Sequence, residues 1–309
     1  MNTTVAICAY ATKRWPLLTG AVTSVVAQLA EGDDVLLVID HNDELLARAA
    51  RQFGADTRVR NYGVARARGD LVAFLDDDAV AEPGWLAGVR SAFDDPDVWA
   101  VGTAAVPAWA NGARPSWFPD EYDWVVGCTY RGLPTEVGEV RNVNGAAMAF
   151  RREAFVRVGG FSAVVGRTGA AYTGCEETEM CIRLRQRVAG ARIVYLPDVQ
   201  VRHHVPRERM MVRHFLRRCY GEGRSKARVA HLVGTTDGLS SERSYVRSTL
   251  PRGVAREVRR GLRGVAGGWA AAALIVVGLG VTGTGYVLGR LGRRATIAAP
   301  AEVVAVAGG

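Results

Sequence analysis

Three consecutive carboxylates, Asp76, Asp77 and Asp78, follow the apolar run Leu71–Leu75. Such a run is typical of a buried strand, and ligands bind at the carboxyl ends of strands in open α/β sheets. Clustered carboxylates repel one another unless a cation offsets their charge. Oxygen-rich acidic clusters suit Mg²⁺ or Mn²⁺, typically with a substrate phosphate completing the coordination shell. The segment therefore predicts a divalent-cation site, with a solvated acidic turn as the alternative.

A second pair of carboxylates, Glu176 and Glu177, follows Gly174 and Cys175 at the start of a predicted helix. A helix N-terminus stabilises the charged form of a carboxylate, whereas repulsion within the pair raises the pKa of one member. This combination suits a general base. The alternative is the ordinary acidic bias of a first helical turn.

Further candidates lie where two other predicted strands end. Cys8, Ala9 and Tyr10 close the strand Thr4–Ala9, and Asp40 follows the strand Val35–Ile39. Because the carboxyl ends of adjacent parallel strands meet at one edge of a sheet, these residues should face one crevice. Asp40 can accept hydrogen bonds there from a base or a ribose hydroxyl, although its sequence context also fits a turn.

Two more segments carry groups that suit anion or metal binding. The segment 61–69 is rich in small residues and contains Arg66 and Arg68, which can pair with a diphosphate. His203 and His204 end a predicted strand, and their side chains should point to opposite faces, so at most one enters the site. No P-loop and no Gly-x-Gly-x-x-Gly sequence follows a predicted strand, so the chain lacks the usual nucleotide and dinucleotide fingerprints.

The elements that position these residues alternate between strand and helix patterns. This alternation predicts βαβ units, a mainly parallel sheet and flanking helices, hence an α/β fold. Residues 107–140 are less regular and hold Trp109, Trp117 and Trp124, which suit either a sugar-binding surface or ordinary packing. The predicted strands are Thr4–Ala9, Val35–Ile39, Leu71–Leu75, Val98–Gly102, Gly145–Phe150 and Arg192–Tyr195, and the helices Trp15–Leu29, Asp43–Phe53, Pro83–Phe93, Arg152–Val158 and Glu176–Val188.

Charge and hydropathy separate the C-terminal part from the rest. The net charge of the 309 residues is +8, and residues 206–264 alone carry 15 basic and 5 acidic side chains. A basic helix is expected at Arg209–Ala230, with a break at Gly221 and Gly223, and Arg252–Val265 is a second basic stretch of this helical extension. Val265–Leu288 has no charged residue and exceeds the roughly 20 residues that cross a bilayer. It can span, lie in the interface or pack on the domain; membrane association is favoured.

The sequence also predicts the cellular compartment of the protein and the disorder of its C-terminal segment. Five scattered cysteines show no disulfide or zinc-site spacing, and the chain starts without a basic segment followed by an apolar one. A reducing, cytosolic environment without a secretory signal is therefore expected. The segment 295–309 is expected to be disordered.

The order of these motifs resembles that of the family 2 glycosyltransferases, which have the GT-A fold, over residues 3–205. The resemblance rests on Cys8-Ala9-Tyr10, Asp40, the segment 61–69, Phe74–Asp78, Asn144-Gly145-Ala146, Arg151-Arg152 leading to Gly159-Gly160-Phe161, Glu176-Glu177, and Tyr195-Leu196-Pro197 before His203. The second acidic residue of the pair is usually aspartate in the family, so the choice between Glu176 and Glu177 as the base stays open.

The resemblance implies a role for each candidate. Cys8, Tyr10 and Asp40 would hold the nucleotide base, and Asp76 the ribose or the metal. Asp78 and His203 would bind a divalent cation, Mn²⁺ or Mg²⁺, and Glu177 would be the catalytic base. Further substrate contacts are expected from Ala9, Arg14, Asn61, Arg66, Asp77, Asn144 and Gly145.

The resemblance also implies a function and a domain plan. It implies an inverting transfer of a sugar from a nucleotide diphosphate, commonly UDP, to a hydroxyl or lipid-linked acceptor in glycan synthesis at the cytoplasmic face of the membrane. No nucleic-acid partner is expected. The expected units are a transferase domain (1–205, divided into a nucleotide half 1–102 and an acceptor half 103–205), a basic extension (206–263), a membrane segment (264–294) and the tail.

Three other functions compete with this one. One is nucleic-acid binding through the basic residues 206–264, although the adjacent apolar stretch favours a membrane surface instead. A sugar nucleotidyltransferase usually carries a glycine-rich basic loop after its first strand, and Ala11–Trp15 lacks those glycines. A catalytically dead, membrane-attached binding module would not need Asp76, Asp78, Glu177 and His203 together.

Overall fold

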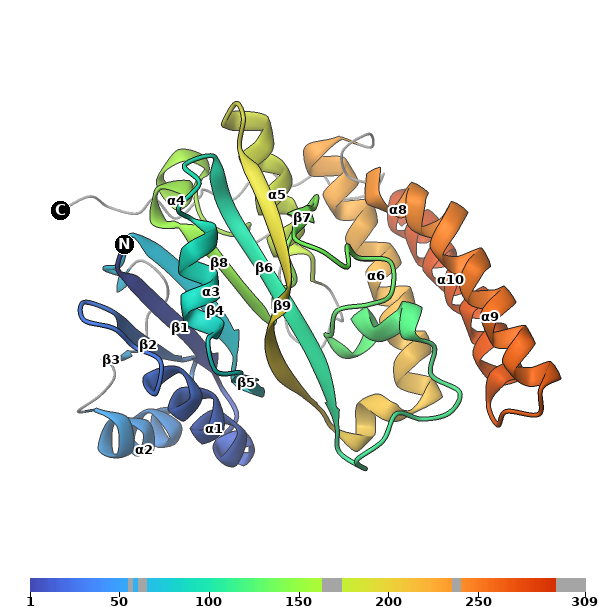
Figure 1. Ribbon diagram of the computed structural model, residues 1–309, viewed down its shortest axis with the longest axis horizontal. Coiled ribbons are helices and arrows are strands. Elements are labelled where there is room, and N and C mark those ends of the chain that lie inside the picture. Colours follow the sequence, from blue (N-terminus) through green and yellow to red (C-terminus); the bar gives the residue numbers. More distant parts are fainter. Residues whose placement is uncertain (55–57, 61–65, 163–173, 235–239, 293–309) are drawn as a thin grey trace.

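The computed structural model describes residues 1–54, 58–60, 66–162, 174–234 and 240–292, and a single mixed sheet runs through it (Figure 1). The strand order is β3-β2-β1-β4-β8-β6-β9-β5, with β7 paired to β9. The predicted α/β fold with a mainly parallel sheet and flanking helices is confirmed. The strands are β1 (Thr3–Ala9), β2 (Asp34–Ile39), β3 (Arg58–Arg60), β4 (Leu71–Asp76), β5 (Ala79–Ala81), β6 (Val98–Trp109), β7 (Gly138–Glu139), β8 (Ala147–Arg151) and β9 (Arg192–Val205).

Parallel pairing joins β3, β2, β1 and β4, and also β6 and β9, whereas β8 runs antiparallel to both of its neighbours. The strands β6 and β9 are longer than predicted, since Gly102 and Tyr195 lie within them. They stay paired through a register shift between Thr103 and Ala104. Pro107 suggested an end to β6, but a proline is tolerated in this outer part of the strand, where side chains are less buried.

Helices cover both faces of the sheet, as the short apolar strands require (Figure 1). One face packs Leu18 and Val22 of α1 and Trp85 of α3 against residues such as Ile7. The helices α4 and α5 cover the other face. The helices are α1 (Trp15–Val26), α2 (Asp43–Phe53), α3 (Trp85–Ala92), α4 (Arg152–Val158), α5 (Glu176–Arg187), α6 (Val212–Val233), α8 (Ser240–Ser244), α9 (Leu250–Leu262) and α10 (Gly268–Leu291), with 3-10 turns at Thr12–Arg14, Asp120–Val126 and Arg207–Met210 and a π-helical turn at Tyr245–Thr249.

The helix α6 continues unbroken through Gly221 and Gly223, where the sequence suggested a break. Close contact with α10 explains these small residues: a Cβ atom on Gly223 would lie 2.0 Å from the carbonyl oxygen of Thr282. Similarly, a Cβ atom on Gly285 would lie 2.3 Å from the carbonyl oxygen of Tyr220. The helix α10 is long and apolar enough to cross a membrane by length and composition, and it lies beside α6 and α9.

A third apolar cluster joins residues from distant parts of the chain, including Tyr122, Phe215 and Ile275. The hydroxyl of Tyr122 donates a hydrogen bond of 3.0 Å to the carbonyl of Ile275 in α10. Trp109 and Trp117 pack against Phe118 in this cluster. The C-terminal helices are therefore packed onto the region 107–140.

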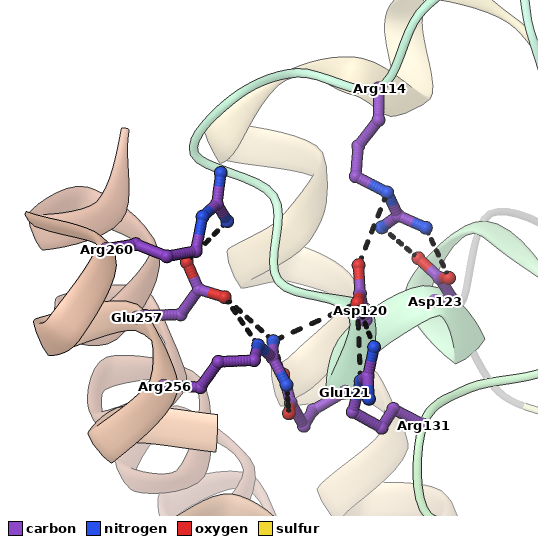
Figure 2. Close-up of polar contacts among 8 residues, drawn as sticks. All are labelled: Arg114, Asp120, Glu121, Asp123, Arg131, Arg256, Glu257 and Arg260. Carbon is purple, nitrogen blue, oxygen red and sulfur yellow. Dashed lines mark hydrogen bonds and ion pairs between the residues drawn. The ribbon is translucent and has the colours of Figure 1, made fainter. Parts of the chain in front are cut away.

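An ion-pair network reinforces this packing, as Figure 2 shows. The carboxylate of Glu121, which is fully buried, accepts hydrogen bonds of 2.7 and 3.1 Å from Arg256 of α9. Arg256 also contacts Glu257, which in turn pairs with Arg260 at 2.7 Å. The segment Asp120–Val126 is thus held to α9 by charge as well as by apolar packing.

Candidate active site

Asp76, Asp78 and His203 form one group of candidate metal ligands. Asp76 ends β4, Asp78 lies in the turn before β5, and β5 pairs with β9 so that Ala79 is opposite His203. The Nε2 atom of His203 lies 3.2 Å from Asp78 Oδ1 and 3.6 Å from Asp76 Oδ2. One ligand atom from each residue lies within 4.8 Å of the others. His204 stays outside this group, as strand alternation predicts.

The charges in this group offset one another. Burial alone would raise the pKa of Asp78, but His203, Arg209 and Arg14 hold it well below its usual range. Burial would lower the pKa of His203, but Asp76, Asp78 and Cys128 raise it well above its usual range. The Oδ2 atom of Asp78 is buried and has no hydrogen-bond partner among the described residues. This oxygen atom lies 3.3 Å from Arg14 Nη2 and 3.7 Å from Arg209 Nη2. Two carboxylates and an imidazole are a donor set that fits Mn²⁺ or Mg²⁺.

Asp77 has a different surrounding from its two neighbours. It is buried, and its Oδ1 atom accepts a hydrogen bond of 2.5 Å from Arg14 Nη1. Burial raises the pKa of Asp77 to about 6, although Arg14 opposes this shift. Arg14 also lies 3.3 Å from Asp78 and 5.9 Å from the ring centre of Tyr10. Arg14 and Asp77 therefore bind each other, and their predicted contact with a substrate stays a prediction.

The predicted nucleotide-binding residues lie at the same edge of the sheet as Asp76. Cys8 pairs with Asp76 across β1 and β4, and the amide of Asp40 donates a hydrogen bond of 2.9 Å to the carbonyl of Ala9. Tyr10 is 57% exposed. Burial, followed by the charge of Asp76, raises the pKa of Cys8 to about 11, so its thiol stays neutral. Asn61 lies outside the described residues, and Arg66 is exposed.

Glu176 and Glu177 begin α5. They lie beside the loop that contains Asn144 and Gly145. A Cβ atom on Gly145 would lie 3.9 Å from Glu177 Oε2, so this glycine lies directly beside the carboxylate. Asn144 accepts a hydrogen bond of 3.1 Å from the amide of Ala146 and donates one of 3.2 Å to the carbonyl of Gly127. Asn144 therefore fixes the loop, while Gly145 leaves room next to Glu177.

The pKa of Glu177 is raised to about 8, first by burial and then by the charge of Glu176. The residue before the pair, Cys175, has a φ of 78°, a left-handed conformation that is unusual without glycine. Its backbone starts the helix in this conformation, which sets the direction in which α5 leaves the loop. A carboxyl group that titrates near neutral pH beside a cavity is suited to proton transfer.

A cavity of about 1020 Å³ connects the two sides of the site. Its lining includes Asp76 of the metal-ligand group, Glu177, and Tyr286 of α10. Trp124 also lines it, so one of the three tryptophans in the irregular region faces this space. The cavity thus runs from the candidate cation site past the candidate base to the apolar C-terminal helix.

Several cavity residues escaped sequence analysis. Arg141 is held by Glu242 at 2.5 and 2.9 Å, and Lys226 lies between Glu242 and Glu222. Cys128 lies 3.6 Å from the Nδ1 atom of His203. These partners are far apart in the chain and lie partly in irregular segments, so no periodic pattern or motif marks them.

Comparisons with known proteins identify the family. The sequence model of the family described as "Glycosyltransferase like family 2" matches residues 2–221. A glucosyl-dolichyl phosphate glucuronosyltransferase of Haloferax volcanii is 33% identical over 241 residues, which cover 73% of this chain and 76% of that protein. A pre-mycofactocin glycosyltransferase of Mycobacterium tuberculosis is 32% identical over 145 residues, which cover 47% of this chain and 29% of that protein.

The fold has a counterpart among solved structures. A mannosyltransferase of Pyrobaculum calidifontis, solved in complex with GDP-Man and Mn²⁺, superposes with a TM-score of 0.55 at 16% identity, covering 92% of this chain and 86% of the other. The resemblance found in the sequence is thereby confirmed. The chain belongs to glycosyltransferase family 2 and is a glycosyltransferase with the GT-A fold.

Proposed function

We propose that this chain transfers a sugar from a nucleotide diphosphate donor to a hydroxyl of a lipid-linked acceptor, with inversion at the anomeric carbon. The observation that carries the proposal is that Asp76 of the metal-ligand group and Glu177 open on the same cavity. A donor diphosphate at the first and an acceptor hydroxyl at the second would meet in that space.

The roles of the residues follow from their positions. Cys8, Tyr10 and Asp40 lie where they would contact the nucleotide, and Asp76, Asp78 and His203 would hold the divalent cation. When bound, Mn²⁺ or Mg²⁺ supplies positive charge that neutralises the leaving diphosphate. The fit rests on the two carboxylates and one imidazole whose ligand atoms lie within 4.8 Å of one another.

Glu177 would take the proton of the acceptor hydroxyl as it attacks the anomeric carbon. Its pKa of about 8 keeps it a strong enough base for this transfer near neutral pH. A single displacement with one base inverts the anomeric configuration. The negative charge of Glu176 would then serve to raise the pKa of Glu177.

The donor and metal are proposed on two grounds. UDP is the commonest carrier in the family, whereas the structurally similar mannosyltransferase was solved with GDP-Man and Mn²⁺. Both nucleotides therefore belong in a first screen. The lipid-linked acceptor is proposed because the Haloferax volcanii relative is named for glucosyl-dolichyl phosphate, and because the cavity reaches α10.

We also propose that α10 attaches the protein to the cytoplasmic face of the membrane without crossing it. Apolar residues including Val277, Leu288 and Leu291 are exposed on α10. The opposite face of the helix lies against α6, which carries exposed arginines such as Arg213 and Arg224. A helix fixed beside so charged a neighbour suits the interface, where apolar and cationic groups both find partners.

The transfer itself is tested by a donor screen. The full chain, Mn²⁺ or Mg²⁺, a panel of UDP- and GDP-sugars and glucosyl farnesyl phosphate should release nucleotide diphosphate with one donor. The product should carry the inverted anomeric linkage by NMR. Asp78→Ala should abolish release. If a folded protein released no nucleotide with any donor, or if the linkage were retained, the proposal would fail.

Membrane attachment is tested by flotation with anionic liposomes. Changing Val277, Leu288 and Leu291 together to serine should reduce the floating fraction, because exposed apolar area drives interfacial binding. The matched control changes Val137 and Val156, which are exposed apolar residues elsewhere on the surface, to serine. Equal flotation of both variants and the unchanged protein would exclude α10 as the attachment.

A further inference from the structure

Three cations line the cavity in addition to the metal-ligand group: Arg141, Arg218 and Lys226. Two of them have close carboxylate partners. Arg141 and Lys226 share Glu242, each with a contact of 2.5 Å, and Lys226 also contacts Glu222 at 3.2 Å. The structure therefore accounts for the charge of these two residues, and the third cation differs from them.

Arg218 has donors that no group in the described part of the chain uses. Among the described residues, its one ion pair is a 3.4 Å contact between Nη1 and Glu222 Oε2, and it makes no hydrogen bond with them. Its side chain is only 21% exposed, so water satisfies the guanidinium incompletely. A guanidinium has five N–H donors in a planar fork that matches two oxygen atoms of one anion. An unsatisfied arginine in a cavity is therefore a site for a phosphate or carboxylate.

The surroundings fix where this anion would lie. Glu222, which holds one edge of Arg218, is itself held by Lys226 and by the thiol of Cys175 at 3.4 Å. A Cβ atom on Gly174 would lie 3.8 Å from both Arg218 Nη2 and Glu176 Oε2. The guanidinium thus lies across one glycine from the acidic pair that begins α5.

The apolar end of the cavity lies close to Arg218 as well. Arg218 belongs to α6, and α10 packs along that helix through Gly223 and Gly285. Thr282 and Tyr286 of α10 line the same cavity as Arg218 and Glu177. The cavity therefore presents a base, then a cation with free donors, then a helix that is apolar along its exposed side.

We propose that Arg218 binds the phosphate of the lipid-linked acceptor and so holds the acceptor hydroxyl at Glu177. This inference rests on the proposed transfer to a lipid-linked acceptor. The lipid chain extends from Arg218 toward α10, and the sugar reaches back to the acidic pair. A carboxylate on the transferred sugar is the competing ligand, and the test separates the two.

The test compares two acceptors that differ in charge, glucosyl farnesyl phosphate and the neutral octyl glucoside. The full-length variants are Arg218→Gln and Arg218→Lys, with Arg157→Gln as the control because Arg157 of α4 is exposed and does not line the cavity. Arg218→Gln should raise the KM for the phosphorylated acceptor about tenfold or more, since hydrogen bonds to charged groups contribute about 1.5–3 kcal/mol. Its KM values for octyl glucoside and for the donor should not change.

The conservative variant Arg218→Lys and the control variant each have their own expected result. Arg218→Lys should keep part of the discrimination, because it retains the charge but loses the planar fork. Arg157→Gln should behave as the unchanged protein. The proposal is overturned if Arg218→Gln weakens both acceptors equally, or if it raises the KM for the donor with either acceptor, which would assign Arg218 to the transferred sugar.

Two measurements on the unchanged protein separate this proposal from the proposed function. In calorimetry without donor, the protein should bind glucosyl farnesyl phosphate more tightly than octyl glucoside. Added farnesyl phosphate should compete for the site and so weaken the binding of glucosyl farnesyl phosphate. Binding of this kind without any transfer would refute the reaction but support the anion site. Transfer without preference for the phosphorylated acceptor would support the reaction and overturn the anion site.

Discussion

The backbone amide of Asp76 donates a hydrogen bond of 3.0 Å to the carbonyl of Ala146. This bond extends the pairing of β4 and β8 by one residue and joins a candidate metal ligand to the loop that holds Gly145 beside Glu177. The distance between the two halves of the site is therefore set by backbone hydrogen bonds within the sheet.

The pH dependence of transfer should follow Glu177. A base must be deprotonated to accept a proton, and the pKa of Glu177 is raised to about 8 by burial and by Glu176. The rate of transfer should therefore rise with pH up to about 8 and then level off. Glu176→Gln removes the second cause, so the whole profile should move to lower pH. Initial rates of nucleotide release between pH 5.5 and 9.5 measure both effects.

Glu177→Gln distinguishes the two members of the pair. Loss of a general base typically lowers a rate by about 10²–10⁴-fold, so the amide variant should lose transfer by that factor while it still binds the donor. Glu176→Gln should retain most of the activity at its own optimum pH. If Glu176→Gln were the inactive variant and Glu177→Gln the active one, the assignment would be reversed.

Asp77 and Asp78 should respond differently to the same change. Asp78→Asn removes a carboxylate from the metal-ligand group and should raise the Mn²⁺ concentration needed for half-maximal nucleotide release by about tenfold or more. Asp77→Asn loses its charge opposite Arg14 and should leave the Mn²⁺ dependence unchanged. Nucleotide release by both variants, measured as a function of Mn²⁺ concentration, tests this difference. An equal shift in both would mean that the turn acts as one unit.

The strand-end residues were predictable because of simple sheet geometry. Parallel strands end at one edge, so Cys8, Asp40 and Asp76 had to lie together once their strands were identified. Strand alternation similarly admitted only one of the two adjacent histidines. The helix-start pattern indicated the pair Glu176 and Glu177, and the choice between them stays a prediction.

The pairing of charges was not predictable in the same way. Arg14 and Asp77 are 63 residues apart, and Arg141 and Glu242 are 101 residues apart. Arginine is frequent in this chain, and nothing in the local sequence singles out a partner for each one. The free donors of Arg218 are likewise visible only when the contacts around it are known.

The network in Figure 2 should contribute to stability through its buried members. Arg256→Gln leaves Glu121 without its cation, and removing one partner of a buried ion pair costs about 3–5 kcal/mol. Because Arg256 is 30% exposed, a smaller loss of about 2–3 kcal/mol is expected. Arg131→Gln is the control: Arg131 is 56% exposed and pairs with Asp120, so its loss should cost less than about 1 kcal/mol. Urea unfolding measures the difference, and equal losses would contradict it.

Two glycines of α10 should respond in opposite directions to alanine. A Cβ atom on Gly285 would lie 2.3 Å from the carbonyl oxygen of Tyr220, so Gly285→Ala forces α10 away from α6 and should lower the free energy of unfolding by about 1–3 kcal/mol. At Gly280 a Cβ atom meets nothing within 4 Å, so Gly280→Ala should raise it by about 0.5–1 kcal/mol through helix propensity. Urea unfolding of the detergent-free protein, with an unchanged m-value, gives both numbers. If Gly285→Ala were neutral, α10 would not be held against α6, and the argument that it lies in the interface instead of crossing the membrane would lose its basis.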